Sequence, residues 1–222
     1  LKDTPQIVFV NDGSVDKTSE ILAKVKKSHN ITVIELKKNR GKGEAMKIGS
    51  ERAIADGAKY LIYMDGDGQH DPSHLPVFIN NLKQFPIVFG YRKLKKSAPF
   101  VRRLGNQISS FIIKHIFRIN RVGDILCGYF GIQAEVFSEI KWHSNDYGVE
   151  AEISAIISKK RIPFKEVLVK TIYLDRNKGV NIFHAMLILF RIPFWAVSRH
   201  SDRFIKLVIF ICLAVIYLLL AF

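Results

Sequence analysis

Two carboxylates, Asp65 and Asp67, lie two residues apart directly after an apolar run at residues 60–64. A short, continuous apolar run with aromatic and β-branched residues is typical of a strand buried on both faces. The pair is therefore predicted at the carboxyl end of a core strand, where open α/β sheets bind their ligands. Carboxylate oxygens at such a place suit Mg²⁺ or Mn²⁺, which would in turn hold phosphate oxygens.

The same pattern has a simpler interpretation as a surface turn, because Asp-Gly pairs are common turn formers. A calcium-binding EF-hand loop is excluded. Counting from Asp65 places His70 where that loop requires glycine and Pro76 where it requires its bidentate glutamate. From this motif alone, a metal site and a plain turn remain equally open.

Two other turns could contact a nucleotide. Asp12 follows the buried-strand pattern at residues 7–10, where its carboxylate could accept hydrogen bonds from a nucleobase or cap the next helix. Lys42 lies in a Gly-Lys-Gly turn that opens the following helix, and it could contact a diphosphate. The turn is not the phosphate loop of NTPases, because Leu36 and Gly43 stand where that motif requires glycine and serine or threonine.

The elements that must position these residues alternate between strands and helices. Short apolar runs and amphipathic patterns predict strands at residues 7–10, 31–36, 60–64, 86–90, 124–132 and 163–173, and helices at residues 17–28, 43–56, 71–82, 104–117 and 149–159. Such alternation indicates βα units around a largely parallel sheet. The predicted fold class is therefore α/β.

Charge and cysteine content restrict the partners and the compartment. The 222 residues carry a formal net charge of +14, which favours anionic partners such as nucleic acid, phospholipid head groups or phosphorylated substrates. Nucleic acid is disfavoured, because the chain has neither an aromatic-interleaved RNA motif nor a Cys/His zinc framework. The only cysteines are Cys127 and Cys212, and the second lies in an apolar tail, so we expect no disulfide and a reducing, cytosolic setting.

The apolar C-terminal region predicts attachment to a membrane. Residues 182–200 are rich in Phe, Ile, Leu and Trp and suit an amphipathic helix in the membrane interface. Residues 204–222 carry Lys206 as their only charge, and as a helix they would extend about 28 Å against a hydrocarbon core of roughly 30 Å. We expect a transmembrane helix there; a core or dimerisation helix is the alternative. The basic residues before and at the start of this span predict that the catalytic side faces the cytoplasm: Arg191, Arg199, Arg203 and Lys206.

Six patterns then follow one another along the chain: V-N-D-G-S-x-D-x-T, N-x-G-K-G-x-A, D-G-D-G-Q-H-D-P, G-Y-R, D-x-x-C-G-Y and R-x-x-G-x-N. Together they resemble the family 2 glycosyltransferases with the GT-A fold, and among these the polyprenyl-phosphate sugar transferases. The resemblance implies a Rossmann-like, mostly parallel central sheet flanked by helices over residues 1–181, with the family's first strand missing from the sequence. The interfacial helix and the transmembrane helix would follow.

The resemblance also implies roles for single residues. Asp12 would read the nucleotide base, and Asp65 and Asp67 would bind Mg²⁺ or Mn²⁺. Lys42 would contact the donor. The other implied site residues are Gln69 beside the metal, Asp124 facing the sugar, and Arg92 and Arg176 facing phosphates of donor or acceptor.

We therefore expect a membrane-anchored, inverting glycosyltransferase that moves a sugar from a UDP- or GDP-linked donor to polyprenyl phosphate in the lipid bilayer. A lipid monophosphate is already a nucleophilic oxyanion at neutral pH, since its second pKa is about 6, so no general base is needed. Transfer to a glycan hydroxyl is an alternative that would need a base, for which Asp124 or Glu150 are candidates. Two interpretations without enzymatic activity also stay open, namely a degenerate, inactive transferase and a basic membrane-tethered binding protein.

Overall fold

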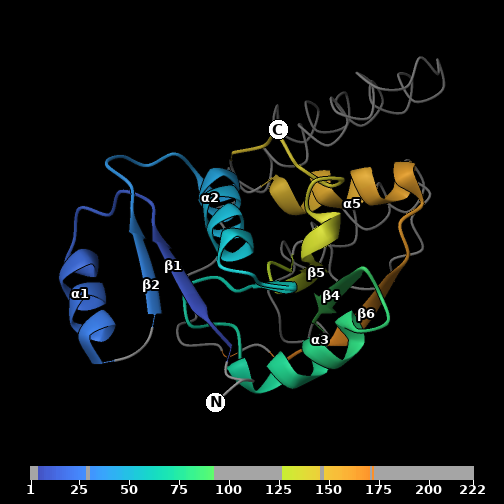
Figure 1. The fold of residues 1–222 in the computed structure, drawn as a ribbon, viewed down its shortest axis with the longest axis horizontal. Helices are drawn as coiled ribbons and strands as arrows, with labels where there is room; N and C mark the ends of the chain where they lie inside the picture. The colour runs from blue at the N-terminus through green and yellow to red at the C-terminus, as the bar shows by residue number, and fades with distance from the viewer. Residues whose placement is uncertain (1–4, 29–30, 93–126, 146–147, 171, 173–222) are drawn as a thin grey trace, which may run out of the picture.

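The computed structural model describes residues 5–28, 31–92, 127–145, 148–170 and 172 (Figure 1). Strands and helices alternate along most of these residues, as the sequence predicts. The strands are β1 (Ile7–Asn11), β2 (Ile31–Glu35), β3 (Tyr60–Tyr63), β4 (Ile87–Tyr91), β5 (Phe130–Gln133) and β6 (Phe164–Leu168). The helices are α1 (Thr18–Ser28), α2 (Lys42–Ala55), α3 (Leu75–Leu82) and α5 (Val149–Lys160), with short 3-10 helices at Pro72–His74 and Ala134–Val136.

The described strands form two sheets rather than the single sheet expected. β1 and β2 pair in parallel, and the larger sheet has the order β3-β5-β4-β6. In the larger sheet β4 and β6 are parallel, whereas β5 runs antiparallel to both of its neighbours, β3 and β4. The expectation of a mostly parallel sheet is thus wrong for β5. Alternation predicts parallel neighbours only where a helix returns the chain to the same sheet edge, and β5 follows β3 and β4 in sequence yet lies between them.

The larger sheet is covered on both faces. Along β4, Ile87 and Phe89 belong to a core that includes Ile153 of α5, while Val88 belongs to a core that includes Phe78 of α3. Figure 1 shows α3 and α5 on opposite sides of this sheet. The continuous apolar run of β4 therefore reflects burial on both faces. Helix α2 packs against β1 of the smaller sheet and β3 of the larger one, and so links the two.

Several predicted elements differ from the structure or lie outside it. Within the described residues, the strand predicted at 124–132 begins only at Phe130, and the strand predicted at 163–173 ends at Leu168. The helix predicted at 104–117 and the membrane segments at 182–200 and 204–222 lie outside the described residues. Among the helices that the structure does describe, none is both long enough and apolar enough to cross a membrane. The additional first strand implied by the resemblance stays a prediction.

Candidate active site

Residues 65–71, called here the acidic loop, lie at the carboxyl end of β3, as the sequence predicts. The backbone N–H of Asp65 donates a hydrogen bond to Nδ1 of His70 at 3.1 Å. The backbone N–H of Gln69 donates to Oδ1 of Asp67 at 3.0 Å, and the backbone oxygen of Gln69 accepts from the N–H of Ile172. The loop is therefore folded back on itself and tied to the chain beyond β6.

His70 is buried beneath this loop and is held by aromatic rings. Its ring stacks on Tyr129 with centroids 5.0 Å apart, and Tyr129 stacks on Phe78 at 4.4 Å. Since Nδ1 accepts the bond from Asp65, the proton lies on Nε2, which is 4.0 Å from Oδ2 of the same aspartate. Burial lowers the pKa of His70 despite the nearby carboxylates of Asp65 and Asp67, so this imidazole is neutral at pH 7.

Lys42 connects the acidic loop to helix α5. Its Nζ lies 2.6 Å from Oδ1 of Asp65 and 2.6 Å from Oε1 of Glu150, which is only 5% exposed. Burial disfavours the charged form of Lys42, but the two carboxylates outweigh burial and raise its pKa, so the ammonium is charged. Burial raises the pKa of Glu150, against the opposing pull of Lys42. The sequence indicates Glu150 only as an alternative base and carries no signal for this pairing.

Gly128 packs directly on the Lys42–Asp65 ion pair. A Cβ at this position would lie 2.5 Å from Oδ2 of Asp65 and 2.8 Å from Nζ of Lys42. Any larger residue would therefore displace the charged groups. The glycine of the Cys-Gly-Tyr pattern is explained by this close approach.

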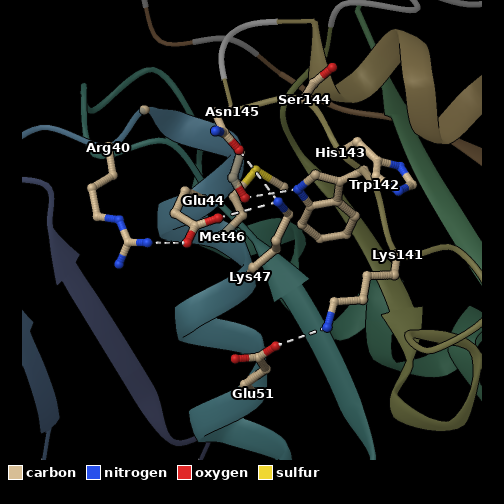
Figure 2. A network of polar contacts seen from close by, with 12 residues as sticks. Arg40, Glu44, Met46, Lys47, Glu51, Lys141, Trp142, His143, Ser144 and Asn145 are labelled. Carbon is tan, nitrogen blue, oxygen red and sulfur yellow. Dashed lines mark hydrogen bonds and ion pairs between the residues drawn. The ribbon is translucent and has the colours of Figure 1, made fainter.

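The Gly-Lys-Gly turn at the start of α2 is closed by the loop at residues 142–145. The N–H of Gly43 donates to the backbone oxygen of Asn145 at 2.9 Å, and Nε1 of Trp142 donates to the backbone oxygen of Gly43 at 2.8 Å. Figure 2 shows Trp142 and Asn145 lying against the first turns of α2. A Cβ on Gly43 would overlap the backbone oxygen of Ser144. The N–H of Gly43 is thus already bonded within the protein, and the expected diphosphate contact of Lys42 stays a prediction.

Asp12 connects two loops at the amino-terminal side of α2. Its Oδ1 accepts from the N–H of Arg40 at 2.7 Å and its Oδ2 from the N–H of Gly41 at 2.8 Å. The alternative that Asp12 caps the next helix is wrong, because it is Asp16 that accepts from the N–H of Thr18 at the start of α1. Each oxygen of Asp12 keeps a second lone pair, so recognition of a nucleobase stays a prediction.

The two predicted arginines and the predicted sugar-facing acid are only partly described. Arg92 follows β4, and its positive charge helps to lower the pKa of His70, so it lies near the acidic loop. Asp124 and Arg176 lie outside the described residues.

The donor set of the acidic loop fits a nucleotide-bound Mg²⁺ or Mn²⁺. Asp67 is exposed, and the side chain of Asp65 is 34% exposed. Within the described ranges, no three His, Cys, Asp or Glu side chains gather in a way that could hold an ion by themselves. Mg²⁺ commonly binds through one or two carboxylates and completes its shell with substrate phosphates and water. The two carboxylates that follow β3 meet that requirement.

Comparisons with known proteins agree with this geometry. The sequence matches the family described as Glycosyl transferase family 2 over residues 2–141. It is 33% identical to the uncharacterized protein MJ0544 of Methanocaldococcus jannaschii, over 79% of this chain and 82% of that protein. It is 27% identical to a UDP-N-acetylglucosamine–dolichyl-phosphate N-acetylglucosaminyltransferase of Methanococcus voltae, over 88% of this chain and 87% of that enzyme.

A solved structure shares the fold. Glucosyl-3-phosphoglycerate synthase from Mycobacterium tuberculosis, crystallised with Mn²⁺, UDP-glucose and phosphoglyceric acid, superposes with a TM-score of 0.62 at 17% identity. The match covers 85% of this chain and 68% of that one. The described strands and helices therefore belong to a GT-A-like α/β fold.

Proposed function

Because the chain belongs to glycosyl transferase family 2, we propose that it transfers a hexose from a nucleotide-linked sugar to a polyprenyl phosphate. The observation that carries the donor half is the position of Asp65 and Asp67 at the end of β3, with Asp65 fixed by Lys42. The acceptor half is supported by the Methanococcus voltae relative, whose name specifies dolichyl phosphate. The net charge of +14 suits two anionic substrates.

Positioning and charge neutralisation carry most of the catalysis in this proposal. Asp65 and Asp67 would hold Mg²⁺ or Mn²⁺, and a bound ion would stabilise the diphosphate as a leaving group. The ammonium of Lys42 and the guanidinium of Arg92 add positive charge near the same loop. The chain thus supplies the charge that allows two phosphates to approach each other.

The reaction is a single displacement. An oxygen of the lipid phosphate attacks the anomeric carbon, the bond from that carbon to the diphosphate breaks, and the electron pair leaves with the nucleoside diphosphate. The configuration at the anomeric carbon is inverted. No proton has to be removed from the acceptor, because the lipid phosphate is already an oxyanion.

Transfer to a glycan hydroxyl would require a general base, and of the two candidates, Asp124 and Glu150, the structure describes only Glu150. Glu150 is buried and bound to Lys42 at 2.6 Å, so it is poorly placed to take a proton from a substrate. The inactive-transferase alternative is disfavoured because the acidic loop and its supporting contacts are intact. We further propose that residues 182–200 and 204–222 anchor the protein with its active site on the cytoplasmic face.

A donor and acceptor panel tests the proposal. Membranes that contain the protein are incubated with polyprenyl phosphate, Mn²⁺ and radiolabelled UDP- or GDP-sugars, and the labelled lipid is extracted and identified. We expect a single donor to label the lipid phosphate. Label that enters a glycan acceptor in competition with the lipid would contradict the acceptor assignment. Absence of both donor binding and transfer would favour an inactive protein.

A further inference from the structure

Glu150 and Lys42 form a buried ion pair behind Asp65. The ammonium of Lys42 is shared by two carboxylates, since its Nζ lies 2.6 Å from Oδ1 of Asp65 and 2.6 Å from Oε1 of Glu150. Lys42 begins α2 and Glu150 lies in the first turn of α5, so two helices meet at this pair. Asp65 is thereby restrained at Oδ1 by Lys42 and at its N–H by His70.

The carboxylate of Glu150 changes how strongly the charge of Lys42 acts on Asp65. Without Glu150, the full positive charge of Lys42 would act on the carboxylate of Asp65, which has to bind a cation. Glu150 balances part of that charge and holds the ammonium through a second contact of 2.6 Å from helix α5. Groups that hydrogen-bond a metal-ligating carboxylate set both its orientation and its affinity for the metal.

We propose that Glu150 is a positioning residue for donor binding, which holds Lys42 so that Lys42 holds the carboxylate of Asp65 toward the cation of the nucleotide. This inference rests on the proposed function, because it presumes that a divalent nucleotide complex binds at the acidic loop. It assigns Glu150 no contact with the substrate and no part in proton transfer.

Glu152 provides a matched comparison on the same helix. It is 6% exposed, close to the exposure of Glu150, but its carboxylate accepts from the backbone N–H of His143 at 3.1 Å and from that of Ser144 at 2.7 Å. Glu152 therefore supports the loop before α5, whereas Glu150 supports the acidic loop through Lys42. Removing either charge disturbs a buried contact, but Glu150 contacts Lys42 directly, whereas Glu152 reaches the turn of Lys42 only through the backbone of the 142–145 loop.

The experiment measures the binding of Mn²⁺ with UDP, and of Mn²⁺ with GDP, by calorimetry without acceptor, alongside thermal unfolding. We expect Glu150→Gln to weaken binding of the preferred nucleotide about 10- to 100-fold. We expect Glu152→Gln to lower the melting temperature as well but to weaken nucleotide binding much less than Glu150→Gln does, because its contact with the turn of Lys42 is indirect. Equal binding by Glu150→Gln and wild type would overturn the inference.

A double variant separates positioning from simple charge balance. Lys42→Met alone leaves Glu150 buried without its partner, and adding Glu150→Gln removes that uncompensated charge while the net charge of the pair equals that of the wild type. We expect the double variant to recover the melting temperature but not nucleotide binding, because Asp65 still lacks its contact. Recovery of binding together with stability would refute positioning. If the wild type binds neither nucleotide with Mn²⁺ and transfers no sugar, the proposed function fails and the inference fails with it.

Discussion

Replacing Gly128 by alanine tests whether the close approach of residues 127–129 to the Lys42–Asp65 ion pair is required. A Cβ at this position would lie 2.5 Å from Oδ2 of Asp65 and 2.8 Å from Nζ of Lys42, whereas ordinary contacts begin at 3.4 Å. To relieve these contacts, Oδ2 must move by about 0.9 Å and Nζ by about 0.6 Å. A misplacement of about 1 Å in a catalytic site can lower the rate roughly a hundredfold.

Gly131→Ala is the matched control. Gly131 lies on β5, and a Cβ there would meet Cδ1 of Leu82 at 2.8 Å, the end of a flexible apolar side chain. Overpacking at either glycine should cost about 1–3 kcal/mol of stability. Only the change at Gly128 presses on charged groups of the acidic loop.

The assay compares sugar transfer and the melting temperature for the two alanine variants. We expect Gly128→Ala to lose about a hundredfold in transfer rate while its melting temperature matches that of Gly131→Ala, which keeps its activity. Wild-type transfer by Gly128→Ala, or equal loss of transfer in both variants, would refute the reasoning.

Three further substitutions test other parts of the site. Asp12→Asn should cost about 1–2 kcal/mol of unfolding free energy, because the amide replaces one of the two oxygens that accept from the N–H groups of Arg40 and Gly41; chemical denaturation measures this loss. Trp142→Phe should cost about 2 kcal/mol by the same measurement, because the buried hydrogen bond to Gly43 is lost along with part of the ring's packing. The pKa of His70 is lowered in the folded protein, so below about pH 6.5 the unfolded chain binds a proton that the folded protein does not. The free energy of unfolding therefore decreases as the pH is lowered. Thermal unfolding between about pH 7.5 and 5.5 should therefore show a smaller decline for His70→Asn than for the wild type, and an equal decline would contradict the assignment of a neutral, buried imidazole.

The parts of the fold that the sequence predicts are those determined by local burial. The apolar run of β4 is buried on both faces, and the run before Asp65 forms β3, so the position of the acidic loop follows from the sequence. The sequence also predicts helix α5 to within one residue of its observed end, at Lys160. These features depend on periodicity and on the break from apolar residues to Asp-Gly turns.

The parts that the sequence does not predict depend on contacts between distant residues. The direction of β5 is set by its pairing with β3 and β4 rather than by its own pattern. The Gly-Lys-Gly turn suggests a phosphate contact, yet Gly43 has to be small because Ser144 and Asn145 pack on it. Likewise, the ion pair between Lys42 and Glu150 joins two helices that are far apart in the chain, so no local sequence motif predicts it.

The central claim is that the acidic loop binds the metal and the nucleotide. The most direct test measures sugar transfer to polyprenyl phosphate by the wild type and by Asp67→Asn, each with Mn²⁺ and with a chelator. Asp67 is exposed within the acidic loop, and its Oδ1 accepts only a backbone hydrogen bond from Gln69 among the described contacts, so the amide should leave the fold intact. The account predicts Mn²⁺-dependent transfer by the wild type, its loss on chelation, and its loss in Asp67→Asn at an unchanged melting temperature. Transfer that persists in the variant, or that survives removal of divalent ions, would contradict the assignment of the acidic loop as the site that binds the metal and the nucleotide.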